Sequence, residues 1–189
     1  MLDSSGKIVV ISNTGPLISA FQCGRIDLLK HYFETIYIPE SELEEFRRHG
    51  ADETIRQLIS EGFVVVERLT ADEKAQARQI ARSVAESTFA RVKDYEHHLP
   101  EAEAMVLMNR KELDAVRILL EEKAARETAK SLRLPLTGFI GVLLRACRDS
   151  LLTPDEMRAL LADCRRQGTR YSDELIAEMY HRCQEVRQE

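Results

Sequence analysis

The chain lacks an excess of basic residues, a pair of closely spaced cysteines and a long apolar segment. Its 189 residues include 27 Lys and Arg against 32 Asp and Glu, which gives a formal net charge of −5. No chain-wide positive field can attract nucleic acid, so a site for such a partner has to be a local patch. The four cysteines are scattered without a C-x-x-C pair, which indicates neither a disulfide framework nor a zinc site and favours reduced thiols in a cytoplasm.

Other absences narrow the class of protein further. The first residues, MLDSSGK, lack the basic start of a signal peptide, and no apolar run approaches the length of a membrane span. The sequence also contains no G-x-x-x-x-G-K-[ST], G-x-G-x-x-G or G-x-S-x-G motif. We therefore expect a cytoplasmic protein without a membrane partner, and neither a nucleotide-binding fold nor a serine hydrolase.

Short apolar runs rich in β-branched residues alternate with helical patterns along the chain. Four of them are typical of strands buried on both faces, at residues 7–11, 36–38, 63–66 and 116–120, and residues 134–137 form a short extended piece. A helix is expected to begin at Pro39, and a long polar helix at the capping box formed by Thr70 and Glu73. Strands that alternate with helices predict an α/β protein whose parallel sheet of four to five strands is covered on both faces.

The length suits one domain with a single core. Residues 1–149 are expected to form its main part, with a helical insertion at about 70–99, and residues 150–189 a C-terminal helical hairpin packed on the same domain. Each hairpin helix carries an apolar stripe, one with Met157 and Leu161 and the other with Ile176 and Met179. We expect these stripes to pack on the chain's own core; the alternative is that they receive a partner helix or a second copy of the chain.

Oxygen-bearing side chains follow the predicted strands at their carboxyl ends, where ligands bind in parallel sheets. The side chains in question are Asn13, Thr14, Glu40, Glu42, Glu44, Glu45, Glu101, Glu103, Glu121 and Glu122. Oxygen ligands from several chain segments are what Mg²⁺ or Mn²⁺ requires. Each residue also has an ordinary structural interpretation: Asn13 as a turn residue, Glu101 as an acid at a helix N-terminus, and the acids after Pro39 as a solvated helix face.

Five segments resemble, in order, the motifs of the PIN-domain family, and in particular a VapC-related prokaryotic subgroup of largely uncharacterised proteins. They are Val10–Ile18 (VISNTGPLI), Ile38–Glu45 (IPESELEE), Pro100–Leu107 (PEAEAMVL), Leu119–Arg126 (LLEEKAAR) and Leu134–Arg145 (LPLTGFIGVLLR). The resemblance spans nearly the whole chain. It implies a three-layer α/β/α PIN fold, dependence on Mg²⁺ or Mn²⁺, cleavage of RNA and a toxin–antitoxin setting.

The resemblance also implies which residues form the site. Asn13, Glu45, Glu101 and Glu121 occupy its catalytic and metal-ligand positions. Two of them depart from the family pattern, because Asn13 and Glu121 both stand where Asp is usual. Asn keeps a carbonyl oxygen but loses the charge that attracts a cation, and Glu adds one methylene of reach. The remaining acids of the second motif, including Glu42, are expected on a solvent-exposed face.

Five residues are candidates for contacts with nucleic acid, either as hydroxyl donors or as a local basic patch. They are Thr14, Thr137, Arg126, Lys130 and Arg145. The helix that follows Thr137 also offers free N–H groups suited to a phosphate. The alternatives are that the two threonines cap helices and that the three cations are only solvated.

Two functions follow from these residues. The first is a metal-dependent endoribonuclease that acts on single-stranded or structured RNA, as the toxin of a toxin–antitoxin pair with a small antitoxin protein and with possible homodimer formation. The alternative is a catalytically weak or inactive PIN-like module that binds nucleic acid or protein, because Asn13 lacks the usual first carboxylate.

Overall fold

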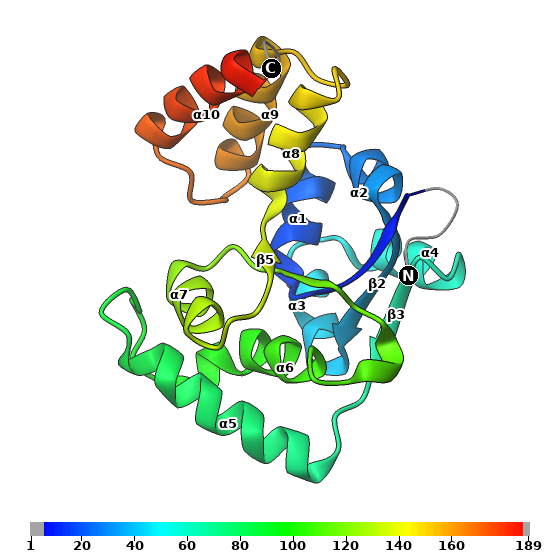
Figure 1. Cartoon of the computed structure of the whole chain (residues 1–189), viewed down its shortest axis with the longest axis vertical. Coiled ribbons are helices and arrows are strands. Elements are labelled where there is room, and N and C mark those ends of the chain that lie inside the picture. The colour runs from blue at the N-terminus through cyan, green and yellow to red at the C-terminus, as the bar shows by residue number, and fades with distance from the viewer. Residues whose placement is uncertain (1–5, 187–189) are drawn as a thin grey trace.

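Five strands form one parallel sheet in the order β3–β2–β1–β4–β5 (Figure 1). The computed structural model describes residues 6–186. The strands are β1 (Ile8–Ser12), β2 (Phe33–Pro39), β3 (Val64–Glu67), β4 (Arg117–Leu119) and β5 (Leu136–Thr137). The predicted α/β class with four to five parallel strands is therefore confirmed.

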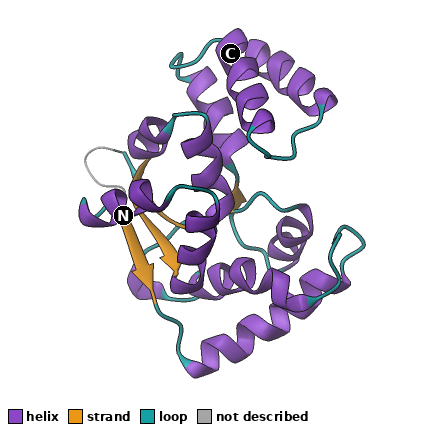
Figure 2. Cartoon of the chain, turned by 180° about the vertical axis from the view of Figure 1, so that it is seen from behind, coloured by secondary structure: helices purple, strands orange, loops and turns teal. Residues whose placement is uncertain are grey.

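Helices cover both faces of the sheet and give three layers (Figures 1 and 2). Successive strand residues point to opposite faces, and accordingly Val10 belongs to one core cluster and its neighbour Ile11 to the other. The first cluster is covered by α1 (Thr14–Gln22), α2 (Ile26–Tyr32), α3 (Leu43–Arg48), α4 (Asp52–Ser60) and α8 (Phe139–Arg148). The second is covered by α5 (Ala71–Glu86), α6 (Leu99–Leu107) and α7 (Lys123–Ser131). Among residues 6–186, no helix is long and apolar enough to span a bilayer.

The C-terminal hairpin packs beside α8 and the C-terminal end of α1, at the top of Figure 1. It consists of α9 (Pro154–Arg166) and α10 (Asp173–Val186). Met157, Leu161, Ile176 and Met179 are buried in the same cluster as the sheet, so the apolar stripes pack on the chain's own core. Residues 1–5 and 187–189 of the predicted division lie outside the described residues.

A disulfide joins α8 to α10, between Cys147 and Cys183. The expectation that all four thiols are reduced is therefore wrong for this pair. The two cysteines are 36 residues apart in sequence, and only the packing of the hairpin on α8 brings them together. Cys23 and Cys164 are free thiols, and the Sγ atom of Cys164 donates a hydrogen bond to the carbonyl of Ser19.

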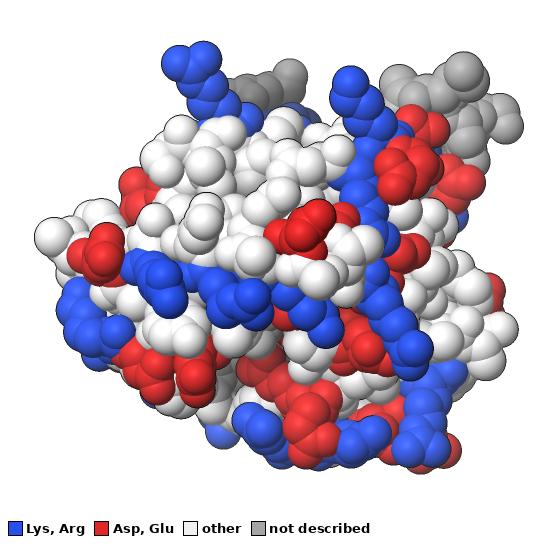
Figure 3. Space-filling view, turned by 90° about the horizontal axis from the view of Figure 1, so that it is seen from below, with Lys and Arg blue, Asp and Glu red and all other residues white. Residues whose placement is uncertain are grey.

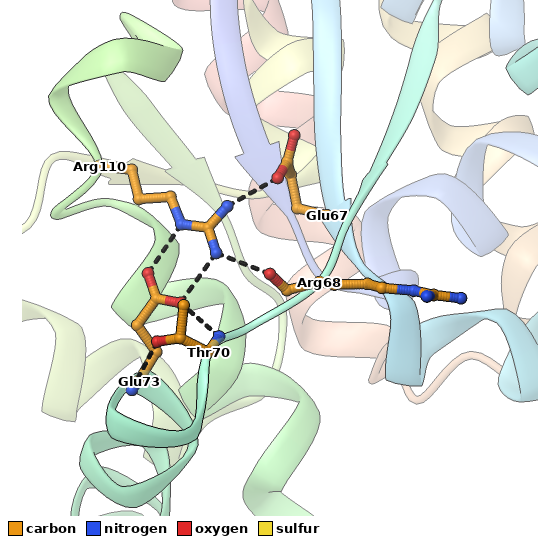
Figure 4. Close-up of polar contacts among 5 residues, drawn as sticks. All are labelled: Glu67, Arg68, Thr70, Glu73 and Arg110. Atoms are coloured by element: carbon orange, nitrogen blue, oxygen red, sulfur yellow. Dashed lines mark hydrogen bonds and ion pairs between the residues drawn. The ribbon is translucent and has the colours of Figure 1, made fainter.

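The segment after β3 is attached to the rest of the fold by one arginine (Figure 4). Arg110 forms ion pairs with Glu67 at the end of β3 (2.6 Å) and with Glu73 in the first turn of α5 (2.7 Å), and it donates to the carbonyl of Arg68 (2.7 Å). The predicted capping box is present, because Glu73 N–H donates to Thr70 Oγ1 and Thr70 N–H donates to Glu73. These contacts set the angle at which α5 leaves the sheet and lies along α6.

Candidate active site

The candidate site begins at the carboxyl end of β1, the central strand. Asn13 is buried at the N-cap of α1, but its side chain makes no capping hydrogen bond. Instead its Nδ2 group donates to Glu101 Oε1 at 3.4 Å, across 88 residues of sequence. The Oδ1 atom of Asn13 is buried without a hydrogen-bond partner. The side chain is therefore directed at another acidic residue of the site and does not act as a helix cap.

The acids that follow β2 lie differently from the prediction. A 3₁₀ turn, η1 (Glu40–Glu42), precedes α3, where one helix from Pro39 was expected. The tighter turn changes the direction of each side chain. As a result Glu42 is fully buried, and the expectation of a solvent-exposed Glu42 is wrong. Its Oε2 atom accepts a hydrogen bond from Thr14 N–H at 3.0 Å, and its Oε1 atom is buried without a partner.

Glu45 reaches the same point from the first turn of α3. The Oγ1 hydroxyl of Thr14 donates to Glu45 Oε2. Thr14 therefore bonds two carboxylates at once, Glu42 through its backbone N–H and Glu45 through its side chain. Its described polar contacts are with these acids, whereas the sequence suggested a contact with nucleic acid.

Glu101 opens α6 and points into the protein. Burial raises the pKa of its carboxyl to about 7, and the negative charges of Glu45 and Glu122 act in the same direction. One oxygen of Glu101 accepts from Asn13, while the other, Oε2, is buried without a partner. Burial likewise raises the pKa of Glu42 well above its ordinary value, with Glu101 and Glu45 adding to the effect. These carboxyls are close enough to disfavour one another's ionisation, as carboxylates that share one site do.

Glu121 follows β4 and is held by two hydroxyl groups. Ser19 donates to its Oε2 atom at 2.9 Å, and Tyr171, from the loop between α9 and α10, donates to its Oε1 atom at 2.9 Å. Burial raises the pKa of Glu121. Gly15 lies between Glu121 and Asn13, since a Cβ atom there would be 3.5 Å from Glu121 Oε2 and 3.7 Å from Asn13 Oδ1. A larger residue at position 15 would occupy the space between the two side chains.

Glu121 also connects two cavities. A small one of about 140 Å³ is lined by Glu45, Glu121, Ser19, Gly15 and residues of the α9–α10 loop. A larger one of about 480 Å³ is lined by Glu121 together with residues of α8 and α10. Glu45 and Glu121 thus open onto the same small space, although they lie 76 residues apart in sequence.

The four predicted ligand positions are therefore brought to one end of the sheet. Asn13, Glu45 and Glu101 are linked through direct contacts or through Thr14, and Glu121 lies on the other side of Gly15. Within residues 6–186, no three His, Cys, Asp or Glu side chains already form a closed ligand group. The buried oxygens without partners nevertheless fit a cation, because they are acceptors that no protein donor reaches.

The predicted basic patch is only partly assembled. Arg126 and Thr137 both line the larger cavity beside Glu121. Burial lowers the pKa of Arg126, and its Nη1 group donates to the carbonyl of Leu120 at 2.7 Å. Lys130 is paired with Glu127, and Arg145 lines a different cavity, where its guanidinium lies 4.5 Å from the ring centre of Tyr32. Lys130 and Arg145 are thus not part of the cavity that contains Glu121.

Sequence reasoning missed other cations. Arg170 and Arg182, on the loop before α10 and on α10 itself, line the larger cavity opposite Arg126. A second group lies on α5, where three exposed basic side chains are spaced four residues apart: Lys74, Arg78 and Arg82. Residues at this spacing share one face of a helix. A basic row accordingly crosses the face of the molecule seen from below (Figure 3).

Comparison with known proteins gives one positive finding. A family model described as PIN domain matches residues 9–185, nearly the whole chain. No curated protein and no solved structure matches at a significant level.

Proposed function

The chain belongs to the PIN-domain family, and from this premise we propose that it is a metal-dependent endoribonuclease whose site comprises Asn13, Glu45, Glu101 and Glu121. PIN domains are generally nucleases that require divalent metal and bind nucleic acid, which supports the coarse assignment. The observation that carries the finer proposal is the group of buried oxygens without partners at this edge of the sheet. Buried polar groups are nearly always paired in proteins, so their grouping favours a missing cation.

Asn13 Oδ1, Glu45 and Glu101 Oε2 would hold Mg²⁺ or Mn²⁺, with Glu121 as the ligand beyond Gly15. A divalent cation in this position supplies charge stabilisation for the phosphate under attack and makes water easier to deprotonate. The protein's own contribution is orientation, because Thr14 fixes the Glu45 carboxylate while Ser19 and Tyr171 fix that of Glu121.

The larger cavity suits the part of the RNA next to the scissile phosphate. Its 480 Å³ is in the range of small-molecule sites, and it begins at Glu121. Arg126 and Arg170 line it, and within residues 6–186 neither forms an ion pair with a carboxylate, so both guanidinium groups are available to phosphate. Tyr171 and Met179 add apolar surface for an unstacked base. These features favour single-stranded RNA or an unpaired loop, because bases in a duplex are not free to enter a pocket.

The test is cleavage of a fluorescent single-stranded RNA by the purified protein with Mn²⁺ or Mg²⁺. We expect cleavage that EDTA abolishes and that is lost in the double variant Glu101→Gln plus Glu121→Gln. The matched control is Glu103→Gln plus Glu127→Gln, which removes two charges from α6 and α7 at solvent-accessible positions. Equal cleavage by the wild type and the first double variant would show that the site is assigned wrongly.

A second function, an inactive module that binds RNA, is favoured by one observation: Asn13 brings no charge to the position of the usual first carboxylate. Calorimetric titration with Mn²⁺ separates the two proposals. Micromolar binding that disappears in Glu45→Ala supports the nuclease. RNA binding without any binding of Mn²⁺ supports the inactive module.

We further propose that the protein acts in the cytoplasm as the toxin of a toxin–antitoxin pair, on the basis of its resemblance to VapC-related proteins. Since the apolar stripes of α9 and α10 are buried, an antitoxin would have to bind elsewhere on the surface. Expression of the chain should arrest growth, and co-expression of a small protein encoded next to its gene should relieve the arrest. A mass measurement in solution tests homodimer formation.

A further inference from the structure

Three buried side-chain oxygens in residues 6–186 have no hydrogen-bond partner, and all three belong to the candidate site. They are Asn13 Oδ1, Glu42 Oε1 and Glu101 Oε2. Two of them come from the expected ligand positions. The third comes from Glu42, which neither the sequence pattern nor the proposed nuclease site includes.

The position of Glu42 relative to Asn13 is the key geometric fact. Its carboxylate accepts a hydrogen bond from the backbone N–H of Thr14, the residue directly after Asn13. The side chain has no exposed surface, and within the described chain no lysine, arginine or histidine is paired with it. A carboxylate is thus placed beside the end of β1, where the family resemblance leads one to expect the carboxylate of residue 13.

We propose that Glu42 supplies the carboxylate that Asn13 lacks and joins Asn13, Glu45 and Glu101 in holding the divalent cation. The inference rests on the proposed function, because it concerns the same metal site. In this arrangement Asn13 contributes a neutral carbonyl oxygen, and the missing charge enters from η1. The number of acidic side chains at the site is then the same as with Asp at position 13 and an uncharged residue at position 42.

A purely structural role for Glu42 accounts for less of the geometry. Thr14 N–H lies in the first turn of α1 and needs an acceptor, because Asn13 does not cap this helix. Any acceptor oxygen would meet that need, including the amide oxygen of Gln. Capping leaves the second oxygen of Glu42 buried and unpaired, whereas a cation would use both the charge and that oxygen.

The test uses Mn²⁺ alone and measures binding by calorimetry, without reference to RNA cleavage. We expect Glu42→Gln to lower the affinity for Mn²⁺ at least about tenfold, because it removes a full charge near a dication in a poorly screened site. The substitution keeps an acceptor for Thr14 N–H, so a capping role would leave the affinity unchanged. The matched control is Glu44→Gln, an exposed residue two positions along that pairs with Arg47.

Rescue gives the sharper result. In Asn13→Asp plus Glu42→Gln the carboxylate returns to position 13, and the affinity for Mn²⁺ should recover to within about threefold of the wild type. Circular dichroism shows whether each variant is folded, and the rescued variant remains informative if Glu42→Gln alone unfolds. A wild type that binds no Mn²⁺ contradicts the proposed function itself. A wild type that binds, together with undiminished binding by Glu42→Gln or an absence of rescue, overturns only the role of Glu42.

Discussion

Raising the pH should destabilise the metal-free protein between pH 5 and pH 8. The reason is the buried Glu101 carboxyl, whose pKa is raised by burial from 4.5 to about 7. Between these values the folded protein holds a proton that the unfolded chain has already released. Because the folded state binds more protons in this range, its free energy of unfolding falls as the pH rises. The stabilisation is fully present below about pH 4.5 and is lost as the pH passes about 7.

The magnitude follows from the difference between the two pKa values. A carboxyl with a pKa of about 7 in the folded state and 4.5 in the unfolded state contributes about 3 kcal/mol. For a chain of this length, 1 kcal/mol corresponds to roughly 2–4 °C in Tm, so the fall should be about 6–12 °C. Burial also raises the pKa of Glu42 and Glu121, which adds to the fall. Below pH 4.5 the pKa of Glu73, lowered to about 2 by Arg110, has the opposite effect, so the comparison starts at pH 5.

The assay is thermal unfolding followed by circular dichroism in EDTA, at four pH values from 5 to 8. Glu101→Gln should flatten the dependence by about the share assigned to that carboxyl. Glu103→Gln, two residues further along α6, should leave it unchanged, because Glu103 bonds with Ser41 at an exposed position. Saturating Mn²⁺ should remove most of the fall, since the cation stabilises the ionised carboxylates. A Tm that rises from pH 5 to pH 8, or a Glu101→Gln variant with the wild-type slope, would refute the reasoning.

Three other outcomes are expected. Removal of the Cys147–Cys183 disulfide by Cys→Ala substitution at both positions should lower the free energy of unfolding by about 4 kcal/mol, from the entropy of the 36-residue loop, and denaturant titration that shows no change would contradict the bond. Arg110→Met should lower stability by roughly 2–4 kcal/mol, because it leaves the mostly buried carboxylate of Glu73 unpaired; hydrogen exchange should then increase first in α5, and a uniform increase over the chain would argue against a local attachment. Gly138→Ala should lower stability by about 1–3 kcal/mol in thermal unfolding, because its Cβ atom would lie 2.8 Å from a backbone carbonyl oxygen, and an unchanged Tm would mean that this approach is looser than described.

The sheet could be predicted from the sequence because its strands carry their own signal. Residues in the central strands are buried on both faces, so apolar and β-branched side chains occur without alternation, as at Val9, Val10 and Ile11. Phe33 was the exception, assigned to a helix although it begins β2. An aromatic residue at the junction of a helix and a strand satisfies either pattern, so only its pairing with Ile8 on β1 decides the assignment.

Contacts between distant segments are what the sequence did not reveal. Cys147 and Cys183 meet only because α10 folds back onto α8. Tyr171 reaches Glu121 from a loop that had no apparent part in the site. Arg170 and Arg182 could have been noticed as hairpin cations, but nothing in their spacing showed that they face the larger cavity.

The acidic run after β2 shows why a metal site is poorly read one position at a time. In one continuous helix, Glu42 and Glu45 would lie about 60° apart and share a face, which favours a common solvated surface. The 3₁₀ turn separates them, so that Glu42 is buried while the side chain of Glu45 remains about two-fifths exposed. A cation responds to the total charge and to the oxygens within its reach, whatever their order along the chain. Asn13 therefore need not indicate an inactive site, since a buried carboxylate bonded to the next residue's N–H brings negative charge to the same end of β1.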